Sequence, residues 1–160
     1  MRRKRIDARA ISPRRPDVSQ TESIDAYLFS HSLKKFADEY LRAALDLTVT
    51  GEALGVLNVS LAATAYMLRL TVEYGGEDAV LKSTLSLSDI ITLDVSFPMG
   101  LPEISEISKI KAAASAAGFH FELRENRILF RTKLTRTGRL PIYATDNRKF
   151  FNVLYDIFFT

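Results

Sequence analysis

The sequence contains no cysteine and no tryptophan, and it has only five prolines and seven glycines among 160 residues. The absence of cysteine excludes disulfides, thiolate metal sites and cysteine nucleophiles. It is also compatible with a reducing compartment. No uninterrupted apolar run of about 18 residues occurs, so we expect no membrane span. The basic N-terminus is not followed by the apolar core of a signal peptide, and we therefore expect a cytoplasmic protein.

Positive charge is unevenly distributed. The chain is 47% hydrophobic and 26% charged, which is typical of a globular protein, and its length fits one domain. Residues 1–16 hold seven basic side chains and one acidic side chain, a net charge of +6, whereas the rest of the chain holds 15 basic and 18 acidic residues. Residues 1–22 also contain few apolar residues, so we predict a disordered basic arm there and a single domain at residues 23–160.

The basic arm can bind nucleic acid or another acidic surface by releasing counterions. A solvated terminus is the simpler interpretation, because no aromatic residues or groove-reading element accompany the charges. The basic-patch candidates in the arm are Arg2, Arg3, Lys4 and Arg5.

Hydrophobic periodicity predicts four helices and two hairpins. The predicted helices cover residues 23–45, 52–74, 103–117 and 146–159, and the predicted strand pairs cover residues 80–87 with 90–97 and 119–124 with 128–134. Gly75 and Gly118 are placed to end the second and third helices. The order is α-α-β-β-α-β-β-α. We therefore predict an α+β two-layer sandwich, with a mixed or antiparallel sheet and its helices on one face.

Three segments in this order resemble parts of the histidine-kinase-like (GHKL) ATPases. Residues 62–76 (AATAYMLRLTVEYGG) are similar to the first helix of that family's nucleotide site. Residues 90–101 (IITLDVSFPMGL) are similar to the strand before its adenine-binding loop, and residues 105–131 to its late helix and hairpin. The resemblance covers residues 24–135 and is closest to the compact domain of bacterial anti-sigma kinases.

The residues that carry chemistry in that family differ here. The resemblance implies a Glu and, four residues later, an Asn that helps to coordinate magnesium. If Glu73 stands where the family often has His, those positions hold Ala65 and Arg69. The segment Phe97–Gly100 replaces the family's Asp-x-Gly-x-Gly, and the helix from Glu103 leaves no glycine-rich lid to donate N–H groups to phosphates. We therefore expect a degenerate fold that uses no cofactor and has no ATPase or kinase activity.

The last predicted helix is the better candidate for an interaction surface. Its aromatic residues occupy more than one helical face, so they need to be buried by the domain itself, by a second copy or by a partner. The interaction candidates are Phe151, Tyr155, Phe158 and Phe159. Our leading hypothesis is a non-catalytic regulatory domain that contacts a protein partner or forms a homodimer.

A nucleic-acid-associated protein is the alternative hypothesis. It would use the basic arm together with the hairpin between Arg124 and Arg139, where Arg127, Arg131 and Lys133 alternate on one face. A solvated sheet face, or an edge strand protected by charge, explains the same pattern.

His31 is a weak phosphoacceptor candidate. The segment Ser30-His31-Ser32-Leu33-Lys34 is loosely similar to the phospho-accepting segment of sensor kinases. An ordinary surface histidine is the favoured interpretation. Neither His31 nor His120 has the neighbours that metal-ligand spacing requires, so we predict no metal site.

Overall fold

The computed structural model describes residues 11, 14–52, 54–75, 80–135 and 147–160. In chain order the elements are β1 (Glu22–Asp25), α1 (Ala26–Phe36), the π-helical turn η2 (Ala37–Leu41), β2 (Leu45–Gly51), β3 (Val56–Val59), α2 (Leu61–Tyr74), β4 (Leu81–Leu87), β5 (Ile90–Ser96), α3 (Ile104–Ala116), β6 (His120–Arg124), β7 (Arg127–Lys133) and α4 (Asn147–Phe159). The predicted α+β class is correct.

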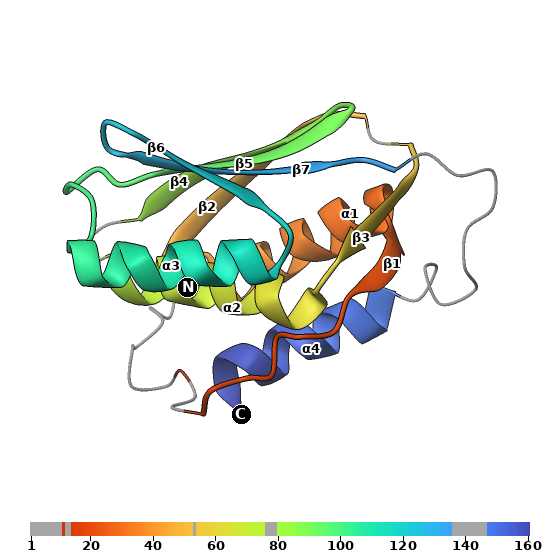
Figure 1. The fold of residues 1–160 in the computed structure, drawn as a ribbon, viewed down its shortest axis with the longest axis horizontal. Helices are drawn as coiled ribbons and strands as arrows, with labels where there is room; N and C mark the ends of the chain where they lie inside the picture. Colours follow the sequence, from red (N-terminus) through yellow and green to blue (C-terminus); the bar gives the residue numbers. More distant parts are fainter. Residues whose placement is uncertain (1–10, 12–13, 53, 76–79, 136–146) are drawn as a thin grey trace.

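The main sheet has five strands in the order β2-β4-β5-β7-β6, and β1 pairs with β3 in a separate two-stranded sheet. Strand β2 runs parallel to β4, while the other neighbours are antiparallel, so the main sheet is mixed. Helices α1, α2 and α3 lie against one face of it (Figure 1). The other face carries alternating polar side chains such as Thr84, Asp94 and Arg131, as expected for a sheet with one side toward water.

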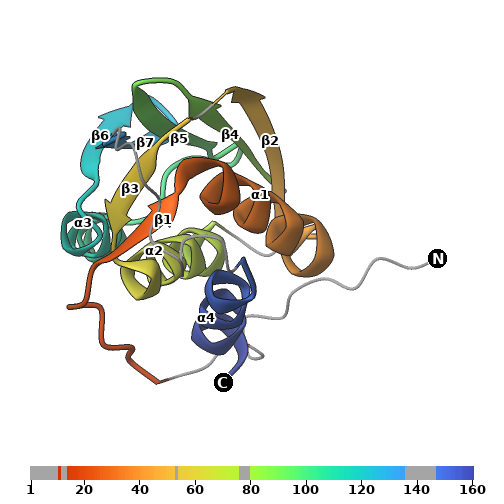
Figure 2. The same ribbon diagram turned by 90° about the vertical axis from the view of Figure 1, so that its right-hand side faces the viewer.

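Helix α4 adds a layer beyond the predicted sandwich. It packs on α1 and α2, on the side of the helices that faces away from the sheet (Figure 2). Phe150, Leu154 and Phe158 recur every four residues and are fully buried, so they form one continuous stripe against those helices. The final helix is therefore buried by other helices and not by the sheet.

The second helix begins later than the sequence pattern indicates. We predicted a start at residue 52, whereas α2 begins at Leu61, and residues 56–59 form β3. Ser60 determines this start, because its hydroxyl accepts a hydrogen bond from the N–H of Ala63 at 3.1 Å. The end at Gly75 is as predicted.

The first predicted helix overlaps β1 at its start and meets β2 at its end. Helix α1 begins after Asp25, whose carboxylate accepts the N–H of Leu28 at 3.1 Å, and not at residue 23, where we predicted the helix to start. The helical path ends with η2 at Leu41, and Leu45–Gly51 forms β2. Apolar and polar residues alternate along β2, so its pattern is that of a half-buried strand.

Elements after α2 agree closely with the prediction. Both hairpins are present, and α3 begins after Glu103, whose N–H is accepted by the Glu106 side chain at 3.3 Å. Gly118 follows α3 with a φ of 78°, the left-handed conformation that favours glycine. In the described residues, no helix is long and apolar enough to cross a bilayer.

Part of the predicted basic arm lies against the domain. Ile11 is buried, and Val18 packs on the core. The Ser60 hydroxyl donates a hydrogen bond to the carbonyl of Val18 at 2.9 Å. Residues 1–10 and 12–13, which include Arg2, Arg3, Lys4 and Arg5, lie outside the described residues, so the prediction of disorder there is untested.

Candidate functional site

The aromatic residues of α4 divide into a buried group and a surface group. Phe158 is fully buried, and its ring lies 5.5 Å from that of Phe36 on α1. Phe150 stacks on Phe29 at 5.4 Å. Phe158 was an interaction candidate, but its ring is enclosed by the domain's own helices.

The other three candidates form a surface with Tyr40 of η2. We call Tyr40, Phe151, Tyr155 and Phe159 the aromatic rim. The Tyr40 ring lies 5.4 to 5.9 Å from each of the other three rings. Tyr40 and Tyr155 are 36% and 40% exposed, whereas Phe151 and Phe159 are half-buried. The rim thus exposes aromatic area at the surface while its members hold one another in place.

A buried arginine lies at the position where the family resemblance implies a magnesium ligand. Arg69 is 7% exposed on α2, and Ala65, one turn earlier, is fully buried. Nη1 of Arg69 donates to the carbonyls of Arg14 and Ile157, both at 3.2 Å. The guanidinium lies 5.4 Å from the Tyr66 ring, and its Nε is 3.8 Å from a carboxylate oxygen of Glu73. Arg69 therefore joins α2 to the segment around Arg14 and to α4.

A groove runs between α2 and α3. Its volume is about 330 Å³, and we call it the α2–α3 groove. The residues that line it are Arg15, Pro16, Val18, Tyr66, Ser108, Lys109, Ala112, Ala113 and Ala116. The first three belong to the segment that Ser60 and Arg69 hold against α2.

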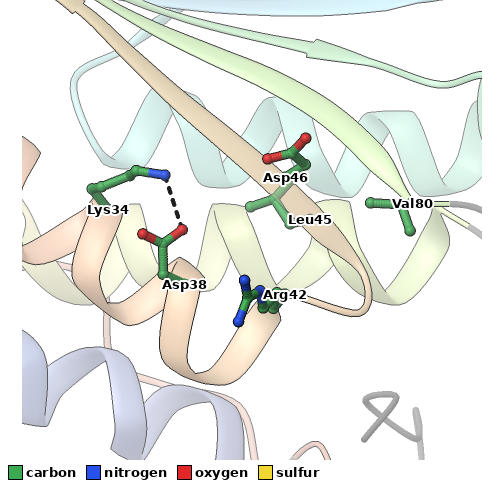
Figure 3. Close-up of a pocket in the computed structure, with 6 residues that line it drawn as sticks. All are labelled: Lys34, Asp38, Arg42, Leu45, Asp46 and Val80. Carbon is green, nitrogen blue, oxygen red and sulfur yellow. Dashed lines mark hydrogen bonds and ion pairs between the residues drawn. The ribbon is translucent and has the colours of Figure 1, made fainter. Parts of the chain in front are cut away.

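A second, more polar pocket lies between α1, η2 and β2. It has a volume of about 580 Å³ and is lined by Lys34, Asp38, Arg42, Leu45, Asp46 and Val80 (Figure 3). Nζ of Lys34 donates to Asp38 at 2.9 Å and to the carbonyl of Leu47 at 2.7 Å. Lys34 is thus engaged in holding α1 to β2. The sequence did not reveal this pocket, because β2 was not predicted as a strand.

In the described part of the predicted basic hairpin, three arginines pair with acidic side chains, and residues 136–139 lie outside the described residues. Arg127 pairs with Asp94 at 2.8 Å, and Arg131 pairs with Glu122 at 2.6 Å. Arg124 also reaches Glu122, at 2.8 Å. The hydrogen bond from Arg124 is the main cause that lowers the pKa of Glu122 below its ordinary value. Desolvation opposes it, and the charges of Arg124 and Arg131 and the hydrogen bond from Arg131 add to the lowering. Of the predicted hairpin cations, Lys133 is exposed.

The two histidines lie on different elements. His31 is exposed on α1, where its ring stacks on that of Tyr27 at 5.8 Å. His120 is exposed on β6, opposite Arg131. In the described part of the chain, no three His, Cys, Asp or Glu side chains are grouped so that they could hold a metal ion. The proposed phosphoacceptor role of His31 stays a prediction.

Comparison with known proteins gives matches among solved structures. The chain is similar to the histidine kinase AdeS of Acinetobacter baumannii, with 14% identity and a TM-score of 0.39 over 74% of this chain and 68% of that one. It is also similar to the catalytic domain of the histidine kinase ThkA in nucleotide-free form. One ThkA structure gives 15% identity and a TM-score of 0.45, covering 74% of this chain and 99% of that one. Another gives 13% identity and a TM-score of 0.43, covering 73% and 97%.

These matches are to proteins of the kind that the sequence resembles. Their identities are below 25% and their TM-scores below 0.5, so we take no argument about activity, nucleotide or partner from them. No protein-family model and no curated protein matches the chain.

Proposed function

We propose that this chain is a non-catalytic protein-interaction domain with a degenerate histidine-kinase-like fold. The observation that carries the proposal is the placement of Arg69. The sequence resemblance implies a magnesium-coordinating Asn there, whereas Arg69 is a buried cation bound to the carbonyls of Arg14 and Ile157. A fixed positive charge opposes a magnesium ion at the same place, and a guanidinium has no oxygen to coordinate it.

The junction between β5 and α3 supports the same proposal. The resemblance implies an aspartate for adenine at this junction, where the chain has Phe97, whose side chain is buried. The preceding carboxylate on β5, Asp94, pairs with Arg127 on the face of the sheet that the helices leave uncovered. Gly100 then turns the chain with a φ of 97°, and α3 begins at Ile104. This short connection leaves little chain for a phosphate-covering lid.

The aromatic rim is the surface that we propose for the interaction. Exposed aromatic rings clustered on one side mark contact sites, because Tyr and Phe contribute large areas at low entropic cost. Lys35 lies over the Phe151 ring at 6.0 Å, and the exposed Glu39 is on η2 next to Tyr40. One charge of each sign thus occurs close to the rim, in space for Lys35 and in sequence for Glu39, and we propose a second copy of this chain as its occupant.

Two measurements test the proposal. Isothermal titration with ATP and magnesium is expected to give no binding heat, and a saturable isotherm would contradict the non-catalytic assignment.

Sedimentation velocity is expected to show a dimer that Tyr155→Ser converts to monomer. Tyr27→Ser is the matched control, because Tyr27 is 61% exposed on α1 and outside the rim. A wild-type monomer at all concentrations would disprove the self-association.

A further inference from the structure

The α2–α3 groove is walled by three parts of the chain that are far apart in sequence. Helix α3 contributes small side chains at helical spacing, Ala112, Ala113 and Ala116, and α2 contributes the ring of Tyr66. The segment with Pro16 and Val18 closes the third side. Ala112 and Ala116 are exposed along the groove, so neither helix packing nor the segment fills it.

The charges that the described residues bring to this groove are positive. Arg15 and Lys109 line it, and no acidic residue is among the described residues of its lining. Nζ of Lys109 lies 5.8 Å from the Tyr74 ring centre and 3.5 Å from the Tyr74 hydroxyl, a long contact that leaves the ammonium exposed to a ligand. Both cations lie on otherwise apolar walls.

The size and the lining of the groove fit a small molecule. Small-molecule sites in proteins measure about 300–1,000 Å³ and combine apolar walls with a few polar groups that fix orientation. At about 330 Å³ the groove is at the lower end of that range. An apolar body would lie against Tyr66 and the alanines, and an anionic group would pair with Lys109 and Arg15.

We propose that the α2–α3 groove binds a small organic anion with an apolar body, an acyl or aryl carboxylate, without a metal ion. The charge selects the anion, because an ammonium and a guanidinium favour a negative group, and the described lining adds no carboxylate to compete for them. The alanines select the size, because larger side chains at Ala112 or Ala116 would occupy the same space. This site is separate from the aromatic rim and does not depend on the function proposed for it.

Amide chemical-shift mapping by NMR tests the site with defined probes. Octanoate represents the acyl carboxylates, 4-phenylbutyrate the aryl carboxylates, and 1-octanol an uncharged molecule of similar shape. We expect saturable shifts centred on Tyr66 and residues 108–116 with at least one carboxylate, and much weaker binding of the alcohol. The stronger of the two carboxylates identifies the class.

Charge and shape variants decide between this site and non-specific contact. Lys109→Glu is expected to weaken carboxylate binding by about tenfold, which is typical of a lost charge-assisted hydrogen bond. Lys111→Glu, an exposed residue of α3 outside the groove, is the matched control and should bind like wild type. Ala112→Phe should abolish binding, whereas Ser115→Phe, also exposed on α3 and outside the groove, should not.

Several results would overturn the proposal: no saturable shifts with either carboxylate, shifts confined to the aromatic rim, equal affinity for 1-octanol, or equal effects of Lys109→Glu and Lys111→Glu. The dispersion of the amide spectrum verifies that each variant is folded. ATP is absent from these titrations, so their failure leaves the proposed interaction domain untouched.

Discussion

Helices α3 and α4 both pack against α2, but most of the side chains that α3 buries are small, whereas those that α4 buries are large. Helix α4 buries Phe150, Leu154 and Phe158, and those rings reach across to α1 as well. Helix α3 buries one large side chain, Ile110, together with the small Ala113 and Ala114, and a groove remains along its edge. The first contact is filled by large apolar side chains, and the second leaves space beside small ones.

Because of this difference, we expect the α4 contact to contribute most to the stability of the fold and the α3 contact to leave space for a ligand. Fully burying a Phe or Leu side chain contributes about 1.5–3 kcal/mol, whereas an alanine methyl contributes much less. The α4 contact should therefore dominate the free energy of unfolding, while the α3 contact tolerates change on its groove side. The following variants test that division.

Truncating a side chain in the buried stripe of α4 should lower the stability of the fold the most. Phe158→Ala is expected to lower the free energy of unfolding by about 3–5 kcal/mol, because it removes a fully buried ring and leaves a cavity. Urea denaturation followed by circular dichroism measures the loss. Phe159→Ala, at a half-buried position next to it, should cost clearly less. Equal losses for the two variants would mean that α4 is not packed as described.

Removing Arg69 should have the next largest effect. Arg69→Ala leaves the carbonyls of Arg14 and Ile157 without their donor and is expected to cost about 1–3 kcal/mol. Arg42→Ala removes the same group from an exposed position and should change stability by less than about 0.5 kcal/mol. Urea denaturation measures both changes. An unchanged free energy of unfolding in Arg69→Ala would show that the guanidinium does not hold these segments to α2.

Enlarging α3 should show which of its sides is filled. Ala114 is fully buried, so Ala114→Leu is expected to cost about 1–3 kcal/mol through overpacking. The leucine side chain of Ala112→Leu would extend into the groove, so this variant should have nearly the same stability as wild type. The thermal unfolding midpoints of the two variants give the comparison, and a similar drop in both would mean that the groove is closed in solution.

The smallest effect is expected outside both contacts, on the uncovered face of the sheet. Because Arg124 and Arg131 lower the pKa of Glu122 below its ordinary value of 4.5, the folded state binds this proton less tightly than the unfolded state. The resulting stabilisation is complete above pH 4.5 and is lost as the pH falls through the lower folded-state pKa. Glu122→Gln should therefore be slightly less stable than wild type at pH 7, and this difference should shrink as the pH falls below 4.5.

Urea midpoints at the two pH values measure this change. Glu125→Gln, at the turn of the same hairpin, removes the same charge without the arginine partners and is the control. A difference between wild type and Glu122→Gln that is as large at pH 3 as at pH 7 would contradict the assignment.

The parts of the fold that the sequence predicts are those with a strong local period. Both hairpins, α3 and α4 follow from alternation, from helical spacing and from stops such as Gly118. Strand β2 was missed although Leu45, Leu47 and Val49 alternate with polar residues, because its apolar start continues the helical spacing of α1. Strands β1 and β3 have four residues each and exist by pairing with one another, which no local pattern indicates.

The candidate site was predicted only in part, for the same reason. Spacing on α4 indicated an aromatic surface, but not which rings α1 and α2 cover, so Phe158 was grouped with Tyr155. Tyr40 was assigned to a helix with no role in the rim, because its contact with α4 joins residues far apart in sequence. The partners of Arg69 are backbone carbonyls 55 and 88 residues away, and no residue type marks them in advance.

The two hydrogen bonds of Arg69 also have a consequence for local unfolding. One side chain holds two segments to α2, so releasing either segment exposes a buried guanidinium that must be hydrated again. Opening of one segment then lowers the free energy needed to open the other. The segment around Arg14 and helix α4 should therefore open as one cooperative unit. Native-state hydrogen exchange would show this unit as matching opening free energies for amides near Val18 and in the last turns of α4. The same amides should separate into two independent groups in Arg69→Ala.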